Sequence, residues 1–371
     1  MKLNFTAPCL FGVESIAAGE LQRLGIENVK AENGRVSFSG DMNTLARANI
    51  CSRYLERICI NVGEFEATSF EALFEGVKAL PWENFIGRYD AFPVNGYSLN
   101  SALFSIPDCQ AITKKAIVER LKSKYHINWF EETGVEVKIR FSILKNQVTM
   151  MIDTSGEGLH KRGYRRKSNM APLKETLAAA MCDTARIYPD TKLIDPFCGS
   201  GTILIEAAMM AKKMAPGLRR FFAAEKFGFV PENVWREERS RAQDLILSNI
   251  EFEATGYDID PDTVRLAEEN AAKAGVSKYI KFKVADVRDF EAPNERSLII
   301  TNPPYGERLL DIKEAEELYK VMGERFTRGN GQKYFVISPH DDFEKIFGSP
   351  ADKRRKLYNG MIKCQLYMYF K

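Results

Sequence analysis

The sequence has few of the residues that build metal centres and disulfide frameworks. Among its 371 residues are only three His, and its seven Cys are scattered with no close pair of the kind that binds a metal. A zinc site and a disulfide-stabilised fold are therefore not favoured. Long apolar runs are also missing: none approaches the ~20 residues that a membrane span needs, and the first residues lack the basic and apolar pattern of a secretory signal. We expect no metal, no membrane and a reducing cytoplasm.

A large excess of one charge is missing as well. The formal net charge is +3, so the composition does not indicate a polyanionic partner. The charge is unevenly distributed, however, because Glu175 alone opposes a run of six basic residues: Lys161, Arg162, Arg165, Arg166, Lys167 and Lys174. Such a patch is either a solvated linker or a surface that contacts phosphates.

The length and the 45% hydrophobic content predict two or three folded domains. Apolar spacing and turn residues first predict a β-α-β-β-α unit, with strands at 3–7 and 35–38 and helices at 12–24 and 41–50. A second unit follows, with helices at 70–80 and 110–125, a strand at 97–99 and a hairpin of 135–141 with 147–152. The pattern breaks at 154–158. We therefore place domains at 1–58, 59–158 and 159–371.

From Pro172 onward, strands alternate with helices. Helices are predicted at 173–188, 202–214 and 262–274, strands at 192–195, 254–258, 281–286 and 298–301, and a closing hairpin at 356–370 that turns at Asn359-Gly360. This order predicts an α/β fold, with a doubly wound sheet in the C-terminal domain and an α+β N-terminal region. The segment 212–253 interrupts the alternation. For this segment we favour a packing role over a place in the lining of the substrate site.

The segment 193–208, LIDPFCGSGTILIEAA, has the features of a cofactor cradle. A strand delivers Asp195 at its carboxyl end, Gly199 and Gly201 allow the backbone to approach a ligand closely, and a helix starts at Thr202. Leu204 stands where a dinucleotide site usually has a third glycine, and the Gly-Lys-Ser/Thr of a triphosphate loop is absent. The segment therefore predicts a cofactor other than a dinucleotide or a nucleoside triphosphate.

Two more carboxylates follow strands in the same way. Asp258 and Asp286 end the next two predicted strands, so that, with Asp195, three acidic residues stand at the ends of successive strands. A carboxylate at the end of the second strand is typical of a ribose contact in a doubly wound fold. The three together indicate a nucleoside site.

Residues 301–308, TNPPYGER, predict a stiff elbow after the last of these strands. Pro303 and Pro304 fix the backbone, lack amide hydrogens and hold the preceding residues extended. The Asn302 side chain and the next carbonyls should therefore project beyond the sheet, where α/β proteins bind their ligands.

These strings resemble those of a known family. The motifs at Asp195 (DPFCGSGT), Asp258 (DID), Asp286 (AD) and Asn302 (NPPY) look like the ordered motifs of class I S-adenosylmethionine-dependent methyltransferases that act on exocyclic amines. The longer strings LHKRGYR (159–165), PLKETLAAA (172–180) and NPPYGERL (302–309) resemble the THUMP-domain ribosomal RNA guanine-N2 methyltransferases, in particular the large-subunit (23S) enzymes. The likeness covers nearly the whole chain. Some members of the family carry a second methyltransferase half, and this sequence ends after one.

The resemblance implies S-adenosylmethionine as cofactor, RNA as partner, and a ferredoxin-like piece and a THUMP module in front of the methyltransferase domain. It implies that the cofactor is held by Asp195, Phe197, Gly199, Gly201 and Thr202 at the methionine part, Asp258 at the ribose, and Asp286 and Val287 at the adenine. Asn302 and the Pro303 carbonyl would hold the target amine while Tyr305 stacks on the base. Separately from the resemblance, the clustering of Lys161, Arg162, Arg165, Arg166 and Lys167 beside the cofactor domain leads us to expect that they contact phosphates.

Three other functions compete with this one. An adenine-N6 methyltransferase of DNA or RNA could use the same elbow, because it would serve any planar amine. A transfer RNA guanine-N2 methyltransferase would differ in the RNA that its front half selects. An RNA-binding or assembly factor with a vestigial pocket is disfavoured, because all five of the pocket residues are intact: Asp195, Gly199, Gly201, Asp258 and Asn302.

Overall fold

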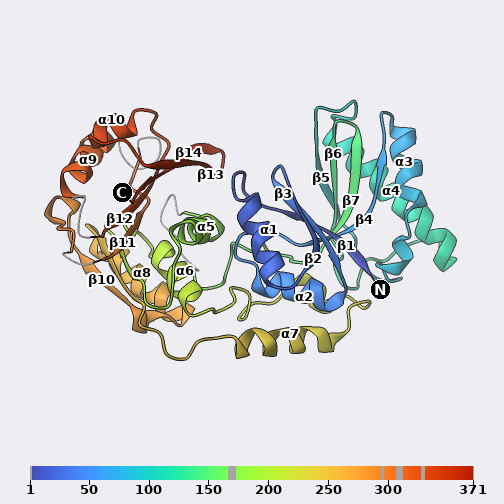
Figure 1. The fold of residues 1–371 in the computed structure, drawn as a ribbon. Helices are drawn as coiled ribbons and strands as arrows, with labels where there is room; N and C mark the ends of the chain where they lie inside the picture. Colours follow the sequence, from blue (N-terminus) through green and yellow to red (C-terminus); the bar gives the residue numbers. More distant parts are fainter. Residues whose placement is uncertain (1, 166–172, 294–295, 306–311, 327–330, 371) are drawn as a thin grey trace.

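The computed structural model describes residues 2–165, 173–293, 296–305, 312–326 and 331–370. They form two lobes side by side, each built on a seven-stranded sheet, with the N-terminus in one lobe and the C-terminus in the other (Figure 1). Within these described ranges, no helix has the length and apolar character needed to cross a membrane.

The N-terminal lobe has the strand order β2-β3-β1-β4-β7-β6-β5, in which β5 and β6 run parallel. Its elements are β1 (Leu3–Pro8), α1 (Glu14–Arg23), β2 (Glu27–Glu32), β3 (Arg35–Gly40), α2 (Met42–Cys51), β4 (Cys59–Glu66), α3 (Phe70–Ala79), η1 (Trp82–Asn84), β5 (Val94–Leu99), α4 (Ile106–Tyr125), β6 (Ile139–Leu144) and β7 (Gln147–Asp153). Strand β4 pairs with β1 on one side and with β7 on the other. The boundary predicted between residues 58 and 59 therefore lies just before a strand that joins both halves of one sheet.

Local sequence signals set several ends of these elements. Asp41 accepts the Thr44 amide at 2.9 Å and caps α2, and Ser69 accepts the Ala72 amide at 3.1 Å and caps α3. The β6–β7 hairpin turns at Lys145 and Asn146 as predicted, with positive φ at both residues. Strand β6 spans residues 139–144 instead of 135–141. Its end moves to residue 144 because the two-residue turn sets the register and the pairing extends up to that turn.

The C-terminal lobe has the strand order β10-β9-β8-β11-β12-β14-β13, and the first five strands run parallel. Its elements are α5 (Glu175–Ala185), β8 (Lys192–Asp195), α6 (Thr202–Ala211), η2 (Ala223–Lys226), α7 (Glu232–Asp244), β9 (Glu253–Asp258), α8 (Pro261–Ala274), η3 (Ser277–Tyr279), β10 (Ile280–Val284), η4 (Val287–Asp289), β11 (Leu298–Thr301), α9 (Ile312–Arg325), β12 (Lys333–Ser338), α10 (Phe343–Phe347), β13 (Lys353–Asn359) and β14 (Ile362–Tyr369). The predicted α/β fold class with a doubly wound sheet is confirmed.

Both faces of this sheet are buried, as a parallel sheet requires. Side chains alternate along β12: Phe335 and Ile337 join the core that contains α5 and α6, whereas Tyr334 and Val336 join a second core with α9 and α10. The first core is continuous with that of the N-terminal lobe, which fixes the two lobes to each other.

Several predicted boundaries in this lobe differ from the structure. Strand β10 ends at Val284, so Asp286 lies beyond the strand that it was predicted to end. Helix α5 spans Glu175–Ala185 instead of the predicted 173–188, and Pro172, which was expected to start it, lies outside the described residues. The closing hairpin turns at Gly360-Met361, one residue later than predicted, because Asn359 still pairs with Ile362. Gly360 alone takes the positive φ of 67° that the turn needs.

The interrupting segment 212–253 contains α7, which lies along α2 of the other lobe (Figure 1). The Arg47 guanidinium of α2 makes two hydrogen bonds, of 2.9 and 2.7 Å, to the buried Glu238 carboxylate of α7. Bidentate pairs of this kind fix orientation as well as distance. Through α7, this segment thus packs one lobe onto the other.

Candidate active site

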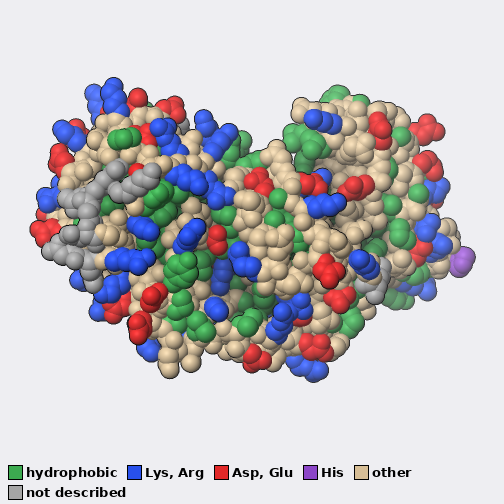
Figure 2. Space-filling model, in the orientation of Figure 1, with side chains coloured by type: hydrophobic (Ala, Val, Ile, Leu, Met, Phe, Trp, Pro, Cys, Tyr) green, Lys and Arg blue, Asp and Glu red, His purple; other side chains and the backbone are tan. Residues whose placement is uncertain are grey.

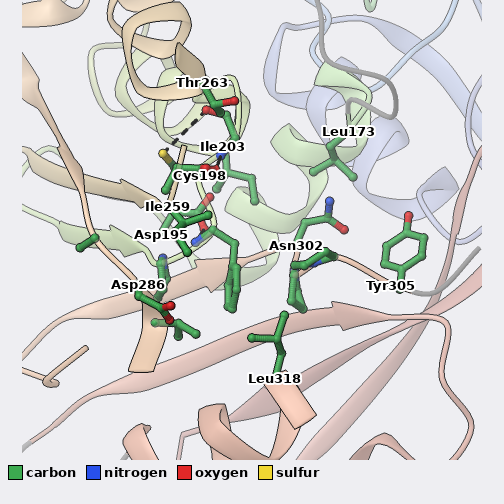
Figure 3. Close-up of a pocket in the computed structure, with 18 of the residues that line it drawn as sticks. Leu173, Asp195, Cys198, Ile203, Ile259, Thr263, Asp286, Asn302, Tyr305 and Leu318 are labelled. Carbon is green, nitrogen blue, oxygen red and sulfur yellow. Dashed lines mark hydrogen bonds between the residues drawn. The ribbon is translucent and has the colours of Figure 1, made fainter. Parts of the chain in front are cut away.

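A cavity of about 640 Å³ opens at the carboxyl ends of the parallel strands. It lies where the strand order reverses, between β8 and β11, which is the usual ligand position in a doubly wound sheet. Its lining includes nearly all of the predicted cofactor and catalytic residues: Asp195, Phe197, Gly199, Thr202, Asp258, Asp286, Val287, Asn302, Pro303 and Tyr305. In Figure 3, Asn302 lies between Asp195 and Asp286 on one side and Tyr305 and Leu173 on the other.

Asp195 ends β8 and is 1% exposed. Its Oδ1 accepts the Thr301 hydroxyl at 2.7 Å and the Phe197 amide at 3.1 Å. Burial raises the pKa of Asp195 to about 7, although both hydrogen bonds act in the opposite direction. The carboxylate therefore anchors the turn that follows β8.

The two glycines of that turn have different surroundings. Gly199 has a φ of 51°, and a Cβ built on it would meet nothing within 4 Å. It lines the cavity, so the missing side chain leaves room for a ligand against the backbone. A Cβ on Gly201, at a φ of 80°, would lie 3.1 Å from Phe282 and 3.2 Å from Ala267. Gly201 thus serves the packing of α6, and it is not among the residues that line the cavity.

The acidic residues at the end of β9 and just beyond β10 hold turns and also line the cavity. Asp258 accepts the Gly199 amide at 3.1 Å and the Asp260 amide at 3.0 Å, and burial raises its pKa. Asp286 accepts the Arg288 amide at 2.8 Å. Each carboxylate oxygen has a second acceptor position. Asp258 and Asp286 can therefore also accept hydroxyl or amine donors from a nucleoside.

Asn302 follows β11 directly, and the environment of its side chain is unusual. Its Oδ1 is buried and has no hydrogen-bond partner among the described residues. A buried acceptor left unpaired costs about 1–3 kcal/mol, which suggests that a bound group satisfies it. The adjacent Pro303 is buried on the cavity wall. Tyr305 is 9% exposed, and its hydroxyl accepts Nδ2 of Asn359 at 2.6 Å.

Helix α9 adds a wall that we did not predict. Glu314, Glu317 and Leu318 also line the cavity. The sequence did contain a signal, because Ala315, Tyr319 and Met322 are buried at helical spacing. Asn270 of α8 was missed too; it is fully buried and donates to the Ser200 carbonyl at 3.1 Å, which holds the glycine turn.

The predicted phosphate contact is wrong for Arg162. This residue is 4% exposed, and its guanidinium donates to the Leu159 carbonyl at 2.6 Å and the Arg53 carbonyl at 2.5 Å. It also lies 3.4 Å from the buried Glu206 carboxylate of α6. A charge enclosed by these acceptors cannot reach a phosphate. Arg162 instead connects the two lobes.

Arg165 is turned inward as well, with 10% of its side chain exposed. It donates to the Leu173 carbonyl at 3.0 Å and to Thr202 Oγ1 at 3.1 Å, and it lies 2.9 Å from the Glu175 carboxylate. Leu173 and Thr202 both line the cavity, so Arg165 supports the cavity wall. Lys161 is exposed and pairs with Glu157 at 3.3 Å, whereas Arg166 and Lys167 lie outside the described residues.

For the cofactor class that the sequence suggests, the chain offers a suitable donor and acceptor set. The open cradle at Gly199, the nucleoside acceptors Asp258 and Asp286 and the unpaired Asn302 oxygen fit a nucleoside with a reactive group directed at an amine. In the described part of the chain, no group of three or more His, Cys, Asp or Glu is placed to hold a metal ion.

Comparison with family models divides the chain into three matched regions. The RlmL ferredoxin-like domain matches residues 4–59, the THUMP domain residues 67–153, and the RMKL-like methyltransferase domain residues 162–368. The three matches follow one another along the chain and together cover most of it.

Two curated relatives match over almost all of the chain. The Bacillus subtilis (strain 168) protein named "Putative RNA methyltransferase YpsC" is 43% identical over 100% of this chain and 96% of its own length. The "Ribosomal RNA large subunit methyltransferase K/L" of Cellvibrio japonicus is 34% identical over 99% of this chain but 51% of its own length. The chain thus spans about half the length of the K/L relatives.

Two solved structures share the whole fold. A Listeria monocytogenes protein, described as a predicted N6-adenine-specific DNA methylase, is 43% identical, with a TM-score of 0.94 over 100% of this chain and 96% of that one. SMU.472, solved in complex with SAH, is 42% identical, with a TM-score of 0.94 over 100% and 98%. With its THUMP domain and its cavity at the ends of β8 and β11, the chain belongs to the RMKL-like methyltransferase family, as the resemblance predicted.

Proposed function

We propose that the protein transfers a methyl group from S-adenosylmethionine to the exocyclic N2 amine of a guanine in 23S ribosomal RNA. The observation that carries this proposal is the buried, unpaired Oδ1 of Asn302 on the cavity wall, next to Pro303. It supplies a hydrogen-bond acceptor where a target amine would enter. The THUMP domain and the K/L relatives support RNA as the substrate.

The two acceptors, Asn302 Oδ1 and the Pro303 carbonyl, would help the target amine to react. An exocyclic amine is a weak nucleophile, because its lone pair is delocalised into the ring. Asn302 Oδ1 and the Pro303 carbonyl can each accept one N–H of the amine and so direct its lone pair into the cavity. An amide is no base at neutral pH, so Asn302 acts by positioning and by electrostatic stabilisation.

The remaining lining residues hold the donor. When bound, S-adenosylmethionine supplies an electrophilic sulfonium methyl group. Asp258 and Asp286 would accept hydrogen bonds from its ribose and adenine, and the open backbone at Gly199 would lie against its methionine part. The SAH complex of SMU.472 supports this cofactor.

The target base must leave its stack to reach Asn302. The Tyr305 ring lines the same cavity, and its hydroxyl is fixed by Asn359 at 2.6 Å. Stacking of a base on an aromatic ring contributes about 1–3 kcal/mol. Tyr305 would therefore hold the extruded guanine beside the two acceptors.

Adenine-N6 methylation is the second candidate, because the Listeria neighbour is described as an N6-adenine-specific DNA methylase. Asn302 and Pro303 would accept an N6 amine in the same way. One experiment separates the candidates: the protein is incubated with S-adenosylmethionine that carries a deuterated methyl group and with separate pools of 23S, 16S and transfer RNA, pre-ribosomal particles and DNA. Mass spectrometry of the digested nucleosides then identifies the product.

We expect deuterated N2-methylguanosine in the 23S pool or in the particles. N6-methyladenosine would overturn the guanine assignment, and label confined to transfer RNA would overturn the 23S assignment. Asn302→Ala protein serves as the control for non-enzymatic methylation.

A further inference from the structure

We propose that one face of the β13–β14 hairpin, together with Phe11 of the N-terminal lobe, binds the single-stranded RNA next to the target nucleotide. This inference rests on the proposed function, because it presumes an RNA substrate. It replaces the phosphate-contacting role that the sequence indicated for Arg162 and Arg165, both of which are turned inward. We call Phe11, Lys356, Tyr358 and Lys363 the hairpin face.

Charge is concentrated in this hairpin. Residues 353–371 contain six Lys or Arg and no Asp or Glu, although the whole chain carries only +3. Arg354 pairs with Glu344, and Arg355 donates to the Gly12 carbonyl. Lys356 and Lys363 are exposed, and the described residues include no carboxylate within ion-pair distance of either. Both ammonium groups are therefore available to phosphates.

The two lysines surround an aromatic ring. Tyr358 lies directly opposite Lys363 in the strand register, so their side chains share one face of the hairpin. Lys356 Nζ lies 5.4 Å from the centre of the same ring. The Phe11 ring meets it edge-on at 5.8 Å and is 49% exposed. Exposed aromatic rings beside cations are typical of surfaces that bind single-stranded nucleic acid.

The hairpin face is connected to the cavity through one residue. Asn359 follows Tyr358 and points to the other side of the strand, where its Nδ2 donates to the Tyr305 hydroxyl at 2.6 Å. Beyond it, Met361 at the turn is 97% exposed. A nucleotide stacked on Tyr305 and a neighbouring nucleotide on Phe11 or Tyr358 would thus lie on opposite sides of the same hairpin end.

Contacts between the lobes hold this surface in place. Arg355 donates to the Gly12 carbonyl at 2.9 Å and to the Ser15 hydroxyl at 3.2 Å. Gly12 has a φ of 87°, and a Cβ there would lie 2.3 Å from the Lys356 carbonyl. The loop that carries Phe11 thus packs closely on β13. Because these contacts between the lobes do not involve RNA, the surface is formed before RNA binds.

The position of the hairpin fits an RNA path between the lobes. In Figure 1, β13 and β14 lie on the side of the C-terminal lobe that faces the N-terminal lobe. In Figure 2, Lys and Arg side chains gather on that side, beside the hollow between the lobes. A strand bound in this hollow could reach both the THUMP-containing lobe and the cavity.

The test compares three variants for binding to a short, labelled single-stranded RNA of mixed sequence. Lys356→Ala/Lys363→Ala removes the two free cations, and Phe11→Ala removes the exposed ring. Lys320→Ala/Lys345→Ala is the matched control, because it removes two exposed lysines from α9 and α10 of the same lobe. Affinity is measured across a series of salt concentrations, and SAH affinity and thermal stability establish that each variant is folded.

We expect the Lys356→Ala/Lys363→Ala protein to show a slope of log affinity against log salt that is shallower by about one to two. Phe11→Ala should weaken binding roughly five- to hundred-fold with an unchanged slope. If the first variant matches the Lys320→Ala/Lys345→Ala control and Phe11→Ala matches the wild type, the hairpin face is not the RNA surface. Because binding is measured without methylation, a failure of the wild type to methylate any RNA would instead count against the proposed function.

Discussion

The Thr301 hydroxyl donates to Oδ1 of Asp195 at 2.7 Å, and this bond joins the ends of β11 and β8 at the point where the strand order reverses. Thr301 is fully buried and Asp195 nearly so. The residue after Thr301 is Asn302, and the turn after Asp195 carries Gly199. This buried hydrogen bond extends the pairing of β8 with β11 to their ends, and so helps to hold the proposed amine acceptor next to the cofactor cradle.

The buried Asp195 carboxylate predicts a pH-dependent stability. Burial raises its pKa from an unfolded value of about 3.9 to about 7. The unfolded chain then loses this proton at lower pH than the folded chain, so the stabilisation is complete below about pH 4 and is lost as the pH rises toward 7. Asp195→Asn keeps an oxygen acceptor but cannot titrate.

The measurement is urea unfolding of both proteins, free of ligand, between pH 4 and 8. The stability of the wild type relative to Asp195→Asn should fall across this range and level off above about pH 7. Glu20, whose pKa burial also raises to about 7, is present in both proteins and cancels in the difference. A difference that stays constant with pH would contradict the prediction.

Asn302→Ala should separate catalysis from cofactor binding. We expect methyl transfer to fall at least about a hundred-fold, because the variant lacks an acceptor for the amine. SAH affinity measured by calorimetry should stay within about three-fold of the wild type. A loss of SAH affinity as large as the loss of rate would mean that Asn302 binds the cofactor instead of the target amine.

The two glycines of the cradle should respond differently to alanine. Gly199→Ala places a methyl group in the cavity and should weaken SAH binding, with a stability loss of about 1–2 kcal/mol from the left-handed backbone. Gly201→Ala adds crowding against Phe282 and Ala267, so its stability loss should be larger, roughly 2–5 kcal/mol. Thermal unfolding and SAH titration measure the two effects; equal stability losses would refute the distinction.

Arg165 is expected to support the cofactor site and not to contact RNA. Arg165→Met removes the hydrogen bonds to Leu173 and Thr202, and SAH affinity should fall about ten-fold. The salt dependence of RNA binding should not change. If RNA binding by Arg165→Met depended less on salt while its SAH affinity stayed intact, Arg165 would contact a phosphate, as the sequence suggested.

Arg162→Met should destabilise the junction between the lobes by about 3–5 kcal/mol, because it leaves the Glu206 carboxylate buried without its charged partner. Adding Glu206→Leu should recover part of this loss. The neighbouring exposed pair offers a control, since Lys161→Ala should change stability by less than about 1 kcal/mol. Urea unfolding measures the stability of these three variants. Similar stability losses for Arg162→Met and Lys161→Ala would show that burial of the Arg162 ion pair does not matter.

The sequence alone determined the elements of the site that depend on neighbouring residues. Asp195, Asp258, Asp286 and Asn302 each lie at or just beyond the end of a short strand, and parallel strands bring their carboxyl ends to one edge. Turn glycines and helix caps are local as well, so Gly199, Asp41 and Ser69 could be identified from the sequence. These features need only the chain within a few residues of each position.

Tertiary structure decided which charges face solvent. Lys161 and Arg162 are adjacent in the basic run, yet one is exposed and the other is enclosed by Glu206 and the Arg53 carbonyl, which lie 44 and 109 residues away in the sequence. Tertiary structure also brings together Asn359 and Tyr305, which form a hydrogen bond although they are 54 residues apart in the sequence. Burial of a side chain depends on the segments that pack over it. Because these segments can be distant in the sequence, a local pattern does not identify them.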